Sequence, residues 1–130
     1  MKSLIPVALL VAALGQVVPQ VGVNHSLFFT IPTQDVNGGA ETIASVEVAV
    51  AATGVDLNGA GVALRTQKGL APSVGVSGFP LGVFLKDLPT GNYTLWIRTL
   101  DLSGNAAAWA AQNVAVDVIA PKTVTGIAIR

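Results

Sequence analysis

Apolar and polar residues alternate one by one along several short stretches of this chain. The clearest is residues 43–51, in which the even-numbered Val46, Val48 and Val50 alternate with the odd-numbered Ser45, Glu47 and Ala49. Successive side chains of a β-strand point to opposite faces of its sheet. The spacing therefore predicts a strand with one buried face and one face partly in contact with water.

Further strands are predicted on the same grounds. Residues 93–100 place Tyr93, Leu95, Ile97 and Thr99 on one face, and residues 113–119 place Val114, Val116 and Val118 on one face. Residues 23–31 are a mostly apolar run, and residues 62–66 form a shorter one. In residues 81–88 the pattern predicts a strand with Val83, Leu85 and Leu88 facing inward and Phe84 and Lys86 facing outward.

Three segments rich in Gly, Pro, Asn and Asp separate these strands, at residues 32–39, 54–61 and 69–80. Such residues favour turns, because Gly and Asn tolerate left-handed backbone while Pro and Asp stabilise turn geometry. No stretch shows convincing helical periodicity. Short strands joined by turns predict an all-β, antiparallel sandwich of two sheets.

Two short motifs resemble a known family. Residues 88–93 (LPTGNY) are similar to the turn into the sixth strand of fibronectin type III and related immunoglobulin-like modules of bacterial surface or phage proteins. Residues 101–105 (DLSGN) resemble the hairpin after that strand. The resemblance covers about residues 23–119, and it implies that Tyr93 bonds nearby backbone in a tyrosine corner. The positions that it marks as defining the fold are Phe29, Leu88, Pro89, Tyr93, Gly104 and Asn105, with Phe29 in place of a core tryptophan.

Residues 120–130 (APKTVTGIAIR) resemble the linker and first strand of a second such module. They predict a strand over residues 123–130, with Ile127 and Ile129 facing inward and Val124 as a further apolar contact. Three arrangements are open for this strand. In the first, it completes the sheet of a neighbouring copy and so builds a head-to-tail filament. In the second, it pairs within its own domain. In the third, it is a frayed end or the start of a further domain.

The first 15 residues have the features of an export signal. Lys2 supplies a positive charge, residues 4–14 are apolar, and residues 13–15 (ALG) put small residues where a signal peptidase reads the chain. The apolar run is shorter than the ~20 residues that span a bilayer as a helix. We expect cleavage after Gly15, no permanent membrane anchor, secretion to the cell surface or beyond, and a sandwich domain of residues 16–119. Retention of this segment would instead favour a capsid, tail or decoration protein of a virion.

The composition argues against several classes of function. Only 11% of the 130 residues are charged, seven basic and seven acidic, so nothing favours a nucleic-acid partner. There is no cysteine, and His25 is the only histidine, so neither a thiolate zinc site nor a thiol–histidine pair can form. The carboxylates are scattered over turns and outer faces. We therefore expect no enzyme, no metal and no cofactor.

Four aromatic residues are predicted on outer surfaces: Phe28, Phe84, Trp96 and Trp109. Exposed rings either stack on sugars or pack against another subunit. The low charge and the many Ala, Val and Gly residues favour subunit packing, with carbohydrate binding by a secreted adhesive module as the alternative. The sequence as a whole predicts a non-enzymatic structural subunit that polymerises with copies of itself outside the cell.

Overall fold

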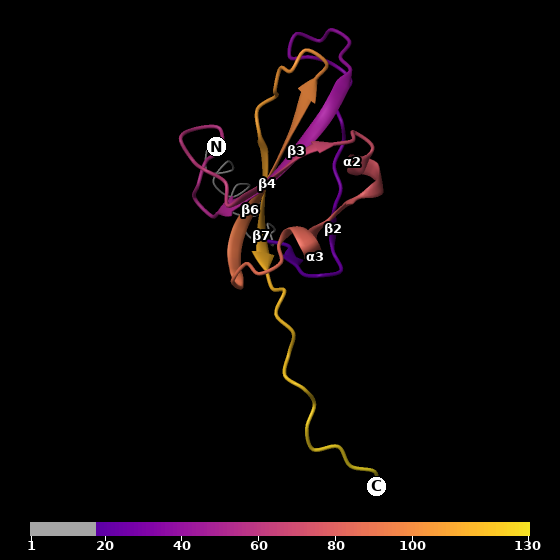
Figure 1. Cartoon of the computed structure of the whole chain (residues 1–130), viewed down its shortest axis with the longest axis vertical. Coiled ribbons are helices and arrows are strands. Elements are labelled where there is room, and N and C mark those ends of the chain that lie inside the picture. Colours follow the sequence, from indigo (N-terminus) through magenta and orange to yellow (C-terminus); the bar gives the residue numbers. More distant parts are fainter. Residues whose placement is uncertain (1–17) are drawn as a thin grey trace, which may run out of the picture.

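The structure is a computed structural model that describes residues 18–130, and it is mostly β (Figure 1). The predicted export signal, residues 1–15, lies outside the described residues. The strands are β1 (Gln20–Val21), β2 (Ser26–Leu27), β3 (Ile43–Ala52), β4 (Arg65–Leu70), β5 (Phe79–Pro80), β6 (Gly91–Asp101) and β7 (Ala110–Val116). Two single-turn helices, α2 (Val74–Ser77) and α3 (Leu81–Phe84), flank β5.

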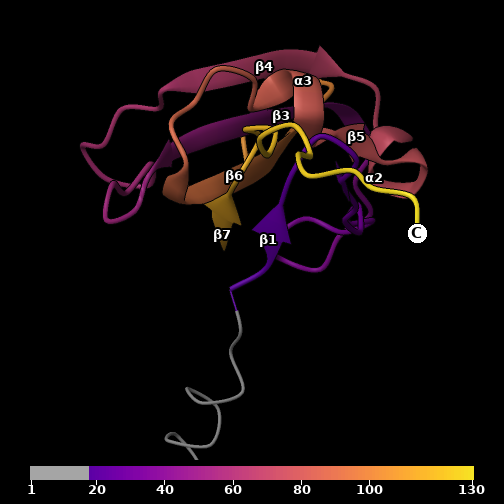
Figure 2. The same ribbon diagram turned by 90° about the horizontal axis from the view of Figure 1, so that it is seen from below.

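Five strands form one curled sheet in the order β1-β7-β6-β3-β4 (Figure 2). The long strands pair antiparallel, as predicted, whereas β1 pairs with β7 in parallel. Strands β2 and β5 form a separate two-stranded antiparallel sheet. The smaller sheet and α3 pack against the larger sheet, because Phe79 and Leu81 share one apolar cluster with the valines of β3.

The predicted alternation of β3 and β6 is confirmed. The register places Val48 opposite Ile97 and Val50 opposite Leu95, so the apolar sides of the two strands face the same way. Val46, Val48 and Val50 are fully buried, and Tyr93 and Leu95 complete the centre of the core. Cross-strand pairs of this kind are the unit that stabilises a sheet.

The opposite face of β3 is more deeply buried than predicted. Ala49 and Ala51 have no exposed surface, and Trp96 packs against them. Ala49 lies directly opposite Trp96 in the sheet, so the small side chain leaves room for the large ring. The segment of residues 53–64 then covers the ring, since Val55 and Leu57 belong to the same cluster. The sheet therefore has apolar clusters on both faces.

Several predicted strand boundaries are wrong. Residues 23–31 contain only the two-residue β2, and the strand predicted at residues 62–66 begins at Arg65 and continues to Leu70. The segment 69–80, predicted as a loop, contains α2 and β5. β2 is short because its partner β5 ends at Pro80, which has no N–H group to continue a ladder.

The strand predicted over residues 81–88 is also wrong, because its first four residues form the helical turn α3. A helix brings positions i, i+3 and i+4 to one side, so Leu81, Phe84 and Leu85 all face the core. Phe84 is 9% exposed and Val83 is 81% exposed, the reverse of the predicted orientation. Leu88 packs partly against the core, as predicted.

The two turn motifs have the geometry expected of them. Tyr93 Oη donates a hydrogen bond to the carbonyl oxygen of Pro89 at 2.6 Å. Asp101 Oδ1 accepts from the backbone N–H groups of Ser103 and Asn105, each at 2.9 Å, and Gly104 has a φ of +86°. These contacts fix the start and the end of β6.

Strand β7 begins three residues before its predicted start, at Ala110, and ends at Val116. Val114 and Val116 are buried and Val118 is partly buried, all against the core, as predicted. Phe29 also packs partly against this core. The last strand before the C-terminal segment is therefore firmly attached to the domain.

Candidate functional site: the C-terminal segment and the sheet edges

The C-terminal segment leaves the domain at the end of β7 and runs away from it (Figure 1). Asp117 Oδ1 still accepts a hydrogen bond from the N–H of Ile119, at 3.2 Å. From residue 119 onward every side chain is exposed, and no residue belongs to a helix or strand. The sequence predicted to form a strand over residues 123–130 therefore has no pairing partner among residues 18–119.

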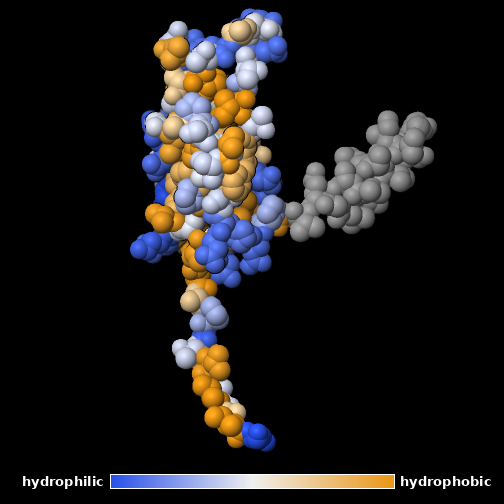
Figure 3. Space-filling view, turned by 90° about the vertical axis from the view of Figure 1, so that its right-hand side faces the viewer, coloured by the Kyte–Doolittle hydropathy of each residue, from blue (hydrophilic) through white to orange (hydrophobic). Residues whose placement is uncertain are grey.

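The predicted contact residues of this segment all lie in solvent. Ile127 is 83% exposed and Ile129 is 99% exposed, and Val124 is likewise exposed. In Figure 3 hydrophobic surface follows this part of the segment almost to its end. In general, an extended segment adds to the edge of a sheet through unpaired backbone groups and branched apolar side chains.

The larger sheet has two edges that differ in how they are closed. Among residues 18–130, β4 has no strand on its outer side at one edge, and at the other edge β1 covers only the end of β7. The β1 register joins Gln20 to Ala115 and Val21 to Val116. Residues 110–113 of β7 therefore have no strand on their outer side within the described part of the chain.

An apolar groove of about 620 Å³ lies at the root of the C-terminal segment. Its walls include Val23, Val83, Leu88, Pro89, Val118 and Ile119, with Lys86 and Asp87 beside them. Leu88 and Pro89, which the family resemblance marks as fold-defining, thus lie beside the point where the segment leaves the domain.

Two of the four aromatics predicted on outer surfaces are buried, so that prediction is wrong for them. Phe84 packs edge-on against Phe79, with ring centres 5.1 Å apart. Trp96 is 7% exposed, because the segment of residues 53–64 covers it, and its Nε1 is buried without a hydrogen-bond partner in the described structure. Phe28 is exposed, as predicted.

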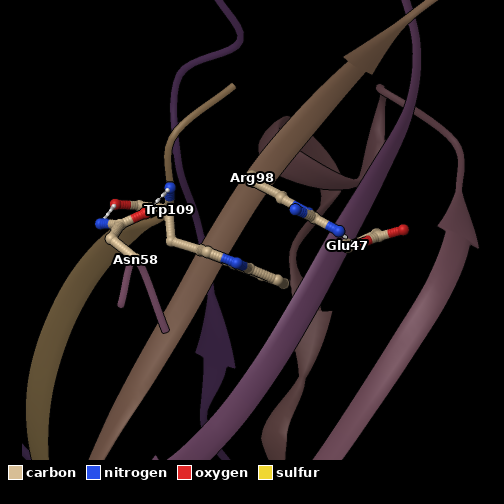
Figure 4. Close-up of polar contacts among 4 residues, drawn as sticks. All are labelled: Glu47, Asn58, Arg98 and Trp109. Carbon is tan, nitrogen blue, oxygen red and sulfur yellow. Dashed lines mark hydrogen bonds and ion pairs between the residues drawn. The ribbon is translucent and has the colours of Figure 1, made fainter. Parts of the chain in front are cut away.

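The fourth aromatic, Trp109, is half-buried in a polar cluster on the outer side of β3 and β6 (Figure 4). Arg98 lies over its ring, with Cζ 4.4 Å from the ring centre, in a cation–π contact. Arg98 Nε also donates to Glu47 Oε1 at 2.8 Å. Asn58 Oδ1 accepts from the N–H of Trp109 at 2.8 Å, and Asn58 Nδ2 donates to its carbonyl at 3.0 Å.

This cluster was not predicted from the sequence. Glu47 and Arg98 are 51 positions apart, and so are Asn58 and Trp109. No local spacing signals such contacts, because they depend on the β3–β6 pairing and on the path of residues 53–64. With one face of Trp109 covered by Arg98, the ring is fixed in the domain and is poorly placed to stack on a sugar from that side.

The polar groups of the described residues are used mainly in local turns. His25 Nδ1 accepts from the N–H of Gly22 at 2.9 Å, which closes the turn before β2. Within residues 18–130 no three His, Cys, Asp or Glu side chains are grouped to hold a metal ion. None of the described helices is long and apolar enough to cross a membrane.

One carboxylate is held in its charged form. The Asn105 side chain donates to Asp101 Oδ2 at 3.0 Å, in addition to the two backbone bonds to Oδ1. These hydrogen bonds, that from the Asn105 side chain first, lower the pKa of Asp101 below its usual value of 3.8. These hydrogen bonds therefore favour the charged form of the carboxylate that closes this turn.

A scan against protein-family models found no match, and neither did a search of curated proteins or a search of solved structures.

Proposed function

We propose that this chain is a non-enzymatic structural subunit that polymerises head-to-tail, donating residues 123–130 of each copy to the sheet of the next. The observation that carries the proposal is a detached segment whose Ile127 and Ile129 are exposed beside unpaired backbone. Burial of each such side chain contributes roughly 1.5–3 kcal/mol. The backbone of an added strand supplies hydrogen bonds as well, so one segment can stabilise a subunit contact.

For the domain itself we propose a fibronectin type III-like sandwich. The hydrogen bond from Tyr93 to Pro89, the turn at Asp101 and the packing of Phe29 against the core support this assignment. Because such sandwiches host many functions, the polymerisation proposal depends on the C-terminal segment and not on the fold.

We place the filament outside the cell or on its surface, on the sequence pattern of residues 1–15. The mass of the native chain tests this location. A secreted subunit begins at residue 16, whereas a chain that retains residues 1–15 favours a virion subunit assembled through the same contact.

The aromatic residues favour assembly over carbohydrate binding. Phe84 and Trp96 are buried, and Arg98 covers one face of Trp109. Only Phe28 presents a largely exposed ring. A single exposed ring is a weak sugar platform and a common feature of subunit contacts.

Negative-stain electron microscopy of the full chain beside a chain truncated after Ala120 tests the proposal. We expect filaments from the full chain and monomers from the truncated chain, both with the same thermal unfolding of the domain. Filaments from the truncated chain would show that the segment is not the donor. Monomers from both chains at high concentration would remove polymerisation as the function.

A further inference from the structure

The end of the domain opposite the C-terminal segment is formed by two turns of the same construction (Figure 1). In each, an Asp Oδ1 accepts from N–H groups two and four residues later: Asp35 from Asn37 and Gly39, and Asp101 from Ser103 and Asn105, all at 2.8–2.9 Å. The penultimate residue of each turn, Gly38 or Gly104, has a φ of +86°. Both turns are therefore closed by the same side-chain and glycine geometry.

Each of these turns exposes an aliphatic side chain directly after its Asp. Val36 is fully exposed and Leu102 is 77% exposed. The two turns line one shallow hollow, so they lie side by side. Both side chains are exposed at the same end of the domain, where they are available for a contact with another molecule. We call Val36 and Leu102 the turn pair.

The outer edge of β7 begins within the sheet and not at this end, since Ala110 lies opposite Ile97 and β6 continues to Asp101. Ala115 N–H donates to the Pro19 carbonyl at 2.9 Å, and Asp117 N–H donates to the Val21 carbonyl at 3.0 Å, so odd-numbered residues direct their backbone away from β6. Ala111 and Asn113 have the same parity, and their N–H groups have no partner within residues 18–130. The carbonyl of Asn113 accepts from Gln112 Nε2 at 2.9 Å.

The opposite edge of the sheet is poorly suited to strand addition. Strand β4 carries Arg65 and Lys68, and Gly69 has a φ of +70°. Its register against β3 shifts between Val46 and Val48. Charged side chains and irregular pairing are features that keep an edge from accepting another strand. In contrast, residues 110–113 of β7 (AAQN) carry no charge.

We propose that the outer edge of β7 at residues 110–113, together with the turn pair, is the acceptor site for residues 123–130 of a second copy. This inference rests on the proposed function and adds to it the location of the acceptor. The occupant is a segment of this chain because that segment is exposed, apolar and unpaired, and because it leaves the domain at the end opposite the turn pair.

The direction of the donated strand follows from this arrangement. Strand β7 runs from the turn pair toward the C-terminal segment (Figure 1). A segment that arrives from a copy stacked on the turn pair continues in the same direction, so it pairs with β7 in parallel. The parallel pairing of β1 with the last two residues of β7 shows that this edge accepts a strand in that direction. The donor segment and the turn pair lie at opposite ends of the domain, so the contact does not close on itself and yields a filament.

Cysteine cross-linking tests the acceptor, because the chain has no cysteine of its own. Ala111→Cys is combined with Ala128→Cys, or with Arg130→Cys to cover a second register on the same strand face. The matched control combines Thr66→Cys on β4 with the same tail substitutions, because Thr66 and Ala111 lie on the same face of the sheet. Under mild oxidation of assembled protein, we expect the Ala111 pairs to give a ladder of disulfide-linked multimers on a non-reducing gel, and the Thr66 pairs to give monomers.

The other outcomes overturn the acceptor assignment in distinguishable ways. A ladder from the Thr66 pairs would move the acceptor to β4. A single dimer band from the Ala111 pairs would indicate that two copies exchange their segments reciprocally, which gives a closed dimer and not a filament. No cross-link, with filaments that vanish on truncation after Ala120, would place the acceptor elsewhere while strand donation stands. Filaments that survive the truncation would refute the proposed function itself.

A second measurement tests the turn pair. Val36→Asp together with Leu102→Asp is expected to raise the concentration needed for assembly roughly tenfold or more, with thermal unfolding of the domain unchanged, because both side chains lie in solvent. Val62→Asp is the control, since Val62 is exposed on the segment of residues 53–64. If Val62→Asp raised the concentration needed for assembly as much as the double substitution did, the turn pair would be excluded from the contact.

Discussion

At the scale of single residues, the most informative side chains are those that fix turns. Tyr93 and Asp101 lie at the two ends of β6, and each bonds backbone within four residues of itself. Such contacts depend on local sequence alone, which is why both could be anticipated from the motifs around them. They hold the strand that lies at the centre of the larger sheet.

Tyr93→Phe removes the hydrogen bond to Pro89 and leaves the ring in the core. We expect the free energy of unfolding to fall by about 1 kcal/mol, the usual net value of one hydrogen bond. The carbonyl of Pro89 can be rehydrated, because Pro89 is exposed, so a much larger loss is not expected. Urea unfolding measures the difference, and an unchanged midpoint and slope would show that the bond contributes nothing to stability.

The turn at Asp101 should respond to acid. The hydrogen bonds lower the pKa of Asp101 in the folded state below 3.8, so the stabilisation is present above pH 3.8 and is lost as the pH falls through the lower folded pKa. NMR titration of the Ser103 and Asn105 amide protons should give a common midpoint below pH 3.8. Asp101→Asn is expected to abolish that titration, and a wild-type midpoint at or above 3.8 would contradict the assignment.

At the scale of elements, α3 shows how a short apolar run is assigned to the wrong class. Residues 81–88 are compatible with alternation and with one turn of helix, and a four-residue helix is too short for its period to be distinctive. The structure selects the helix because Leu81, Phe84 and Leu85 then fill the space between the two sheets. Packing against other elements decided the element type.

Substitutions within α3 separate these two interpretations. Phe84→Ala should lower the free energy of unfolding by about 3–5 kcal/mol, because it leaves a cavity beside Phe79. Val83→Ala, in the same turn, should change it by less than about 0.5 kcal/mol, because Val83 lies in solvent. Chemical denaturation of both variants measures the contrast. The reverse order of effects would restore the strand interpretation.

At the scale of the whole molecule, the domain and its C-terminal segment are energetically separate. The segment makes no contact that its own domain needs, so changes in it should alter association and not folding. Ile127→Asp with Ile129→Asp is expected to prevent assembly, with thermal unfolding of the domain unchanged. Lys122→Asp, which changes charge outside the predicted strand, serves as the control. Sedimentation velocity measures the association state, and unaltered assembly of the isoleucine variant would contradict donation of this strand.

The sequence by itself determined the features that depend on near neighbours: the alternation of β3, β6 and β7, the turns at Tyr93 and Asp101, and the apolar pattern of residues 123–130. Each of these is set by residues within a few positions of one another, where backbone geometry and side-chain parity act directly.

Only the tertiary structure decided that Trp96 is buried, that Arg98 covers Trp109, that β1 pairs in parallel and that residues 81–84 are helical. Each of these outcomes joins parts of the chain that are far apart in sequence. Trp96 is buried because Ala49 leaves space opposite it and residues 53–64 fold over it, and Arg98 is held by Glu47, 51 positions away. A local pattern specifies which side of a strand a residue occupies, but only the packing of distant segments determines whether that side is covered.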